Sequence, residues 1–430
     1  MVAPLNATIF AYQVGFGDCF LLRFSYPDGA RRHILIDFGT TGLPENVASS
    51  HMLRVAEDIR DKCGGRNGVL DVLVATHRHR DHISGFATSN GVGSGDIIRK
   101  LAPKVIIQPW TEAPEAPVDW LGPEHSDVQT AFASRRASLA AMQQVAQRAL
   151  TFLDLNGASV PRAIADQLRF VGENNLSNRS AIDNLQAMEG RHEYVFHGCD
   201  PGLADVLPGI EVNVLGPPTL RQSESIRKQR SSDPDEFWQL TAQRLVEATT
   251  QSDAKPLFPG KKSVRATRLF TEQRWLSHRI DDANAELMLG LVRALDDQMN
   301  NTSVILLFRA GKKTLLFPGD AQIENWQYAL QSKFAKLLAD VDVYKVGHHG
   351  SRNATPRSMW NSFSKRGGET REDRLVSVLS TKHGKHGSED KKTEVPRRTL
   401  VNELEAKSNF HSTELLADGV LYEEIPIALG

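Results

Sequence analysis

The sequence predicts an α/β protein built from layers of strands and helices. Short apolar segments recur between turn-forming residues, and several of them alternate with segments of helical periodicity. At 430 residues the chain exceeds the usual size of one domain, so it is either one large α/β domain with insertions or two domains. A chain of this length can bury an ample core in both cases.

Strands bounded by turns open the chain and return in its C-terminal third. They are expected over residues 7–12, 19–24, 33–37, 69–75, 104–109, 191–196, 210–215, 303–308, 314–317 and 341–346. Tyr26-Pro27-Asp28-Gly29 predicts a hairpin turn after the second strand. Residues 96–101 predict a short helix, and apolar residues at helical spacing from Ile323 to Leu337 predict one amphipathic helix.

Two stretches depart from this rhythm and are interpreted as helical insertions, over residues 111–190 and 219–295. The first begins as a loop over 111–125 and continues as a long helix around 126–152, where apolar residues recur at helical spacing. The second is polar and charged, and it predicts a mainly helical segment. We expect it to form a lid, a surface for a protein partner or for self-association, or a solvated decoration without function.

Composition and charge favour an ordinary intracellular enzyme. The formal net charge is −1 with 24% charged residues, so an anionic partner must be attracted by local patches. Cys19, Cys63 and Cys199 are scattered and outside any zinc-ribbon spacing, which is typical of plain thiols in a reducing compartment. The sequence opens without a basic, apolar leader, and no run approaches about 18 apolar residues. We therefore expect a cytoplasmic protein without a membrane segment.

The densest group of metal-ligand side chains is the run from His77 to His82, which holds three imidazoles and a carboxylate directly after a buried strand. Neutral imidazole and carboxylate are ligands that zinc and similar divalent cations prefer, and a strand end holds them rigidly. Two later strands end in similar residues, in Pro318-Gly319-Asp320 and in Gly347-His348-His349-Gly350. Together these segments predict a metal site, because donors at several strand ends can converge.

At these positions the sequence resembles the metallo-β-lactamase fold superfamily, whose hallmark is His-x-His-x-Asp-His. It looks most like the branch that contains the hydrolase domain of the ComEC competence proteins. Besides the histidine motif, the resemblance includes residues 14–19, 35–39, 210–218, 300–303, 317–320 and 345–351. The matching stretches cover residues 1–110, 190–220 and 296–400. The resemblance implies a single four-layer αββα sandwich over residues 1–430, interrupted by the two insertions.

The resemblance also implies two divalent metal ions, zinc or alternatively manganese. His77 and His79 would hold one ion, Asp81 and His82 would hold the other, and Asp320 would bridge them.

Two ligand positions stay open. Either His349 or His348 would complete the second site. Many relatives supply another histidine for the first ion shortly before the bridging aspartate, where this chain has Asn300 or Asn301. An amide oxygen is a poorer zinc ligand than imidazole, so one site is expected to be weaker, to prefer manganese or to fill only with substrate.

Further histidines and one aspartate are candidates for supporting roles. His192 and His197, near a predicted strand, either replace the missing ligand or are ordinary histidines. Near the end of the chain the ComEC branch has a Gly-His-Pro element, and His386 fits its histidine better than His383, as a proton donor or phosphate contact. Asp37, at the end of its strand, would orient a metal ligand, as metal-bound histidines usually require.

The expected chemistry is hydrolysis. A metal pair lowers the pKa of a bound water from about 15.7 to about 7, and ions about 3.5–4 Å apart can stabilise the attacking and leaving oxygens of a phosphodiester. The resemblance implies phosphodiester or nucleic-acid hydrolysis, with Asp81, Asp320 and His386 at the catalytic centre.

Several basic residues would either contact the phosphates of a substrate or simply lie solvated on the surface. They are Arg78 and Arg80 in the histidine motif and the clusters within residues 261–268 and 382–398. Two alternatives stay open. The first is a metallo-hydrolase of another ester, thioester, lactone or small cyclic nucleotide. The second is a binding protein with a degenerate metal site.

Overall fold

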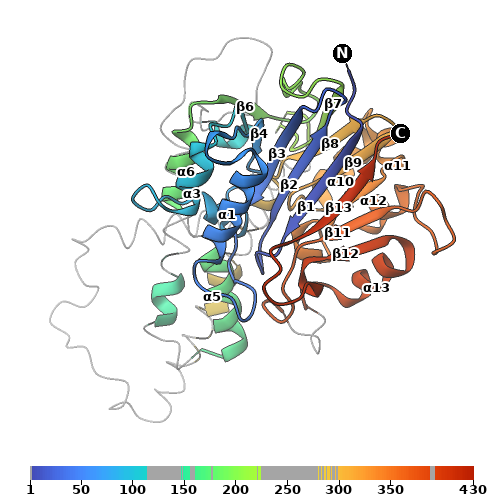
Figure 1. Cartoon of the computed structure of the whole chain (residues 1–430). Coiled ribbons are helices and arrows are strands. Elements are labelled where there is room, and N and C mark those ends of the chain that lie inside the picture. The colour runs from blue at the N-terminus through green and yellow to red at the C-terminus, as the bar shows by residue number, and fades with distance from the viewer. Residues whose placement is uncertain are drawn as a thin grey trace, which may run out of the picture.

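The computed structural model shows an α/β protein of two mixed sheets that pack face to face, with helices on their outer faces (Figure 1). The structure describes residues 2–113, 160–175, 178–219, 221–223, 301–387 and 393–430, with parts of 147–154 and 279–300. Within these ranges, no helix is both long and apolar enough to cross a membrane. The predicted α/β class is confirmed.

Among the described residues, the first sheet has seven strands in the order β13-β1-β2-β3-β4-β5-β6. These strands are β1 (Asn6–Tyr12), β2 (Cys19–Ser25), β3 (Arg31–Phe38), β4 (Val72–Val74), β5 (Val105–Pro109), β6 (Arg191–Val195) and β13 (Tyr422–Ala428). Strands β13 to β3 pair in antiparallel fashion, whereas β3 to β6 are parallel. The first and last strands of the chain are therefore neighbours, in a register that runs from Asn6 opposite Ala428 to Tyr12 opposite Tyr422.

The second sheet, in the part of the chain that the structure describes, has six strands in the order β12-β11-β10-β9-β8-β7. These strands are β7 (Ile210–Gly216), β8 (Ile305–Ala310), β9 (Lys313–Phe317), β10 (Val343–Lys345), β11 (Val376–Leu379) and β12 (Asn409–Ser412). Strands β7 to β9 are antiparallel and β9 to β12 are parallel. The sequence predicted every strand of both sheets up to β10, with boundaries within about two residues except for β4, which is shorter at its start.

Helices cover the outer face of each sheet. The helices are α1 (His51–Lys62), α2 (Arg80–Ile83), α3 (Ser94–Lys100), α5 (Arg162–Asn175), α6 (Arg179–Gln186), α10 (Ile323–Gln331), α11 (Ala335–Ala339), α12 (Arg357–Ser362) and α13 (Arg398–Lys407). Short 3-10 turns lie at η1 (Gly65–Asn67), η2 (Ser84–Phe86), η3 (Trp110–Glu112), η5 (His348–Gly350) and η6 (Thr413–Leu415). Helices α1, α3 and α6 pack on the first sheet, and α10 to α13 pack on the second (Figure 1).

Strand side chains alternate between the two faces of a sheet, and this alternation divides the core into layers. In β5, Val105 and Ile107 face the second sheet, whereas Ile106 faces the helices. In β9, Leu315 faces the first sheet and Leu316 packs against the helices of the other side. The apolar runs of these strands are continuous in sequence because both of their faces are covered.

The predicted insertions lie mostly outside the described residues. Of the first, over 111–190, the described part is largely helical in α5 and α6, and the described residues of 147–154 are helical where the long helix was expected. The rest of that helix, and nearly all of residues 219–295, are not among the described residues.

One prediction was wrong: residues from Ile323 to Leu337 form two helices rather than one. Ser332 separates α10 from α11 with an extended backbone (φ −87°, ψ 175°). Its hydroxyl donates to the carbonyl of Ala329 at 2.7 Å and accepts from the backbone N–H of Phe334 at 3.2 Å. A serine hydroxyl competes with the helical backbone in this way, and hydrophobic spacing alone does not reveal the break.

We predict that His33 in β3 destabilises the fold in acid. Burial lowers the pKa of His33 from 6.5 to about 4, so the unfolded chain takes up a proton that the folded chain refuses. Stability is then lost as pH falls from about 6.5 to about 4, by about 2 kcal/mol between about pH 7.5 and about pH 5. Urea unfolding of wild type and His33→Gln at both pH values checks this. Equal losses in the two proteins would contradict it.

Candidate metal centre

The predicted site residues lie where parallel strands of both sheets end. Asp37 is the last residue but one of β3, the histidine motif follows β4, Asp320 follows β9, and His349 follows β10. Ligand sites of α/β sheets commonly lie outside the carboxyl ends of their strands. Segments that are up to about 300 residues apart in the chain therefore meet at one place.

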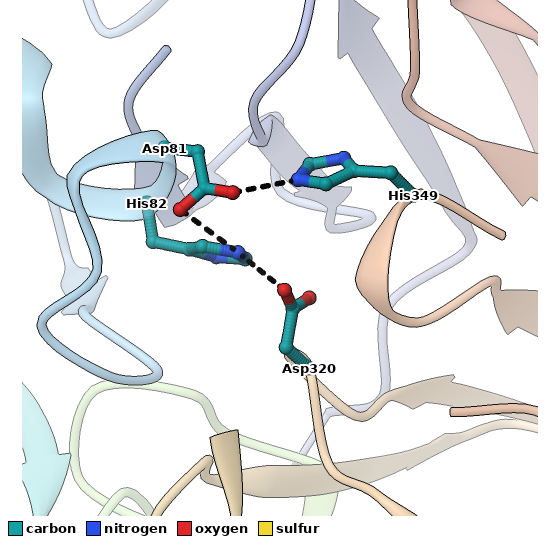
Figure 2. A group of neighbouring side chains, drawn as sticks. All are labelled: Asp81, His82, Asp320 and His349. Atoms are coloured by element: carbon teal, nitrogen blue, oxygen red, sulfur yellow. Dashed lines mark hydrogen bonds and ion pairs between the residues drawn. The ribbon is translucent and has the colours of Figure 1, made fainter. Parts of the chain in front are cut away.

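Four buried side chains form a compact group, which we call the Asp-His group: Asp81, His82, Asp320 and His349 (Figure 2). Asp81 Oδ2 lies 2.9 Å from His349 Nε2, and Asp320 Oδ2 lies 3.1 Å from His82 Nε2. Asp81 Oδ1 is 3.9 Å from His82 Nε2. One donor atom from each of the four lies within 4.8 Å of the others, so a single cation can contact all of them.

Local backbone geometry directs these side chains inward. Helix α2 begins at Arg80, so Asp81 and His82 lie in its first turn with fixed direction. His348 and His349 both have positive φ, 48° and 51°, which turns the chain sharply after β10. This turn buries the ring of His349 and points the backbone N–H of His348 at Asp320 Oδ1, at 2.9 Å. Such strained conformations persist only where the surroundings fix them.

Three inward polar atoms of the Asp-His group are buried without a hydrogen bond of good geometry in the described part of the chain: Asp81 Oδ1, His82 Nε2 and Asp320 Oδ2. His82 Nε2 and Asp320 Oδ2 face each other as an ion pair at 3.1 Å, and Asp81 Oδ1 lies 3.9 Å from the same nitrogen. Buried polar atoms that are incompletely satisfied are costly, and here three of them converge. Imidazole nitrogen and carboxylate oxygen are a donor set that suits zinc or manganese, so these residues fit a divalent cation.

The outward nitrogens of the same histidines are held in place. His82 Nδ1 lies 2.7 Å from Asp37 Oδ2, and Asp37 itself accepts from the backbone N–H and the hydroxyl of Thr76 at 2.7 Å each. His349 Nδ1 lies 2.9 Å from the carbonyl oxygen of Ser380, which follows β11. A nitrogen that donates outward leaves the other nitrogen of the ring as a lone-pair donor toward the group.

His77 and His79 form a separate pair beside the Asp-His group, which we call the histidine pair. His77 Nε2 and His79 Nδ1 are 3.0 Å apart, and the ring of His77 lies 4.2 Å from that of His82. Two imidazole nitrogens on one tetrahedral zinc ion, each at about 2.0–2.1 Å, would be about 3.3 Å apart. The pair thus has nearly the separation that a shared ion requires.

The structure adds two site residues that the sequence analysis did not single out, Asp18 and Lys345. Lys345 is buried, and its ammonium forms an ion pair with Asp18 and lies 3.6 Å from Asp320 Oδ1. Asp18 Oδ2 is 3.8 Å from His82 Nδ1. Both residues lie in segments that carry the family resemblance. Their positions at the ends of predicted strands were the feature of the sequence that could have marked them as site residues.

Burial and charge move the pKa values of the site in opposite directions. Burial, reinforced by His82 and His79, lowers the pKa of His77 well below its usual value. Burial also acts to lower the pKa of His82, but the carboxylates of Asp320, Asp37 and Asp81 outweigh it and raise that pKa well above 6.5. The centre is therefore rich in negative charge and attracts cations.

Three of the other predicted ligands lie outside the Asp-His group. His348 is half-buried, with Nδ1 3.0 Å from the hydroxyl of Ser351. The amide nitrogen of Asn300 donates to Asp296 at 3.3 Å, and that of Asn301 donates to Glu324 at 3.2 Å.

The remaining histidine candidates are also placed apart from the group. His386 is half-buried and forms an isolated bridge with Val395, and His383 is exposed. His192 and His197 bind backbone carbonyls, and His197 packs on the rings of Tyr328 and Phe334. The side chains of His192 and His197 are thus held by backbone and ring contacts away from the Asp-His group.

Of the two basic residues in the motif, Arg78 is already paired. It makes a bidentate contact with Glu112, whose oxygens lie 2.8 and 3.0 Å from Arg78 Nε. Arg80 is exposed.

A short segment of the chain is similar to a known protein. No family model matches the chain. A segment of 56 residues is 41% identical to Recombination protein 2 of Haemophilus influenzae. The match covers 13% of this chain and 6% of that protein. Fold and geometry thus define an α/β protein with a buried cluster of histidine and aspartate that could bind metal ions.

We predict that Lys345→Met strongly destabilises the protein, because it leaves Asp18 as an unpaired buried carboxylate. Breaking a buried ion pair in this way costs about 3–5 kcal/mol. The double variant Lys345→Met/Asp18→Asn should recover a large part of that loss. Guanidinium unfolding with chelator present measures both values, and strictly additive losses would contradict the pairing.

A matched control comes from an exposed pair. Arg309 lies 2.7 Å from Glu211, and both side chains are about half exposed. Arg309→Met should cost less than about 1 kcal/mol, because solvent screens the pair.

Proposed function

We propose that the chain is a metal-dependent hydrolase with the αββα fold of the metallo-β-lactamase superfamily, and that it acts as a phosphodiesterase or nuclease. The observation that carries the proposal is the Asp-His group, in which one donor atom from each of four buried residues lies within 4.8 Å of the others. Two sheets between helical layers support the fold assignment. The sequence motifs shared with the ComEC branch support both the fold assignment and the hydrolase activity.

In this proposal the histidine pair holds one divalent ion and the Asp-His group holds the other, with Asp320 between them. We favour zinc, with manganese as the alternative. Of the two adjacent histidines, we assign His349 as the ligand, because its ring is buried against Asp81 while His348 is half-buried and turned to Ser351.

When bound, such ions polarise a phosphoryl or carbonyl group and lower the pKa of water to about 7. The chain's own residues fix the donors and keep bulk water out. Asp37 and the carbonyl of Ser380 hold the outward nitrogens of the two histidines in the Asp-His group. Lys345 offsets part of the negative charge next to Asp320. His386 is proposed as a proton donor or phosphate contact that reaches substrate from outside the group.

The phosphodiester class of substrate rests on two further supports. The resemblance is to a branch associated with nucleic-acid hydrolysis, and the matched relative is named for recombination. Because Arg78 is paired with Glu112, phosphate contacts are assigned to other basic residues, such as Arg80 and the C-terminal cluster within 382–398.

The test of this proposal is metal content measured together with activity. Purified protein should contain zinc or manganese by mass spectrometry and should hydrolyse bis-p-nitrophenyl phosphate. Chelator should abolish the activity, and added metal should restore it. A panel of single- and double-stranded DNA, RNA, thioesters and lactones then separates the phosphodiesterase from its alternatives. Metal-free protein, indifferent to chelator and to Asp320→Ala, would instead indicate a binding protein with a degenerate site.

The adjacent histidines provide a sharper comparison. His349→Ala removes a proposed ligand, and loss of a residue that only supports a ligand already lowers affinity or activity by about 10–100-fold. We therefore expect His349→Ala to reduce activity by more than about 100-fold, and His348→Ala to have a much smaller effect because its backbone N–H to Asp320 is kept. The reverse order would contradict the assignment of His349.

A further inference from the structure

His79 meets a carboxylate that does not belong to the Asp-His group. Its Nε2 lies 3.5 Å from Oδ1 of Asp296, while its Nδ1 faces His77 Nε2 at 3.0 Å. The side chain of His79 is 2% exposed and that of Asp296 is 18% exposed. The two ring nitrogens of His79 thus have different partners, one on each side.

Asn300 contacts the other oxygen of the Asp296 carboxylate. Asp296 and Asn300 are both helical and one turn apart, and the amide nitrogen of Asn300 donates to Asp296 Oδ2 at 3.3 Å. Asn300 is fully buried. Oδ2 of Asp296 thus contacts Asn300, while Oδ1 faces His79.

We propose that Asp296 is a positioning residue of the metal centre: its Oδ1 accepts a hydrogen bond from Nε2–H of His79 and so keeps the Nδ1 lone pair turned toward the ion held with His77. This inference rests on the proposed function and deepens it. Metal-bound imidazoles commonly donate their other N–H to a carboxylate, which fixes the tautomer and raises ligand basicity. Asn300, which the sequence suggested as a ligand, then acts through Asp296 rather than on the ion.

The same arrangement occurs once more in this centre with the ring nitrogens exchanged. Asp37 contacts Nδ1 of His82, whose Nε2 faces Asp320. Asp296 contacts Nε2 of His79, whose Nδ1 faces His77. Each proposed ion therefore has one histidine that is oriented by a carboxylate. Asp296 follows directly in sequence on the predicted second insertion, residues 219–295.

The test is a zinc titration against a chelating dye, with wild type and three variants at position 296. Wild type should bind two zinc ions. Asp296→Ala should weaken one of them by about 10–100-fold and leave the other unchanged, because the loss of an outer partner has that effect on affinity. Asp296→Asn has nearly the same volume but no charge, so its zinc affinity should lie between those of wild type and Asp296→Ala. Asp296→Glu, which keeps the carboxylate, should recover most of the affinity.

Glu324→Gln is the matched control. The carboxylate of Glu324 accepts from Asn301, the residue next to Asn300, so this variant removes a similar charge close by. We expect zinc affinity within about twofold of wild type, since no proposed ligand of the ions is oriented by this pair.

The outcomes separate this inference from the proposed function. Two zinc ions bound by Asp296→Ala with wild-type affinity would overturn the role of Asp296 and leave the metal centre intact. A wild type that binds no zinc would overturn the proposed function, and the inference with it.

A second measurement does not need a folded variant at position 296. Long-range ¹H–¹⁵N NMR of zinc-loaded wild type, with His79 assigned from His79→Gln, should show zinc on Nδ1 and a proton on Nε2. Zinc on Nε2 of His79 would overturn the inference.

Discussion

The rest of the site depends on one constraint: parallel strands of two packed sheets end at a shared edge, and acidic side chains at those ends are buried together. Asp18, Asp37, Asp81 and Asp320 are each at most 2% exposed, and Lys345 is the buried ammonium that lies among them. Burying a carboxylate is costly unless it is paired or coordinates a metal. The Lys345 ammonium and the hydrogen bonds accepted by Asp37 offset part of the negative charge of these carboxylates. A divalent cation would satisfy the remainder, which includes the inward oxygens of Asp81 and Asp320.

The imidazoles of the centre share a second constraint, because each has one nitrogen occupied from outside. The outside partners are the Thr76 hydroxyl for His77, Asp296 for His79, Asp37 for His82 and the Ser380 carbonyl for His349. The remaining nitrogens face inward, so the structure arranges donor direction as well as donor type. This differs from a chance cluster of histidines, in which both nitrogens would take whatever partner is near. Rigid strand ends supply most of these partners, which favours a preorganised site.

The sequence predicted the layers and many residues of the candidate site because both leave local patterns. Apolar runs between turns mark the strands, and the segment from His77 to His82 holds several candidate ligands. The adjacent His348 and His349 could not be told apart, since the choice depends on two consecutive positive φ values after β10.

Asp18 and Lys345 were missed because their pairing joins residues more than 300 positions apart. The break at Ser332 was missed because a single hydroxyl, and not hydrophobic spacing, ends the helix. Strands β12 and β13 were not predicted either; β13 is held largely by its pairing with β1 at the other end of the chain.

Binding of a divalent cation by the Asp-His group is tested most directly by anomalous X-ray diffraction from zinc-loaded crystals. We predict an anomalous peak at the zinc edge within about 2.0–2.2 Å of donor atoms of Asp81, His82, Asp320 and His349. A peak located only elsewhere, or no peak at these residues in crystals soaked with excess zinc, would contradict this prediction.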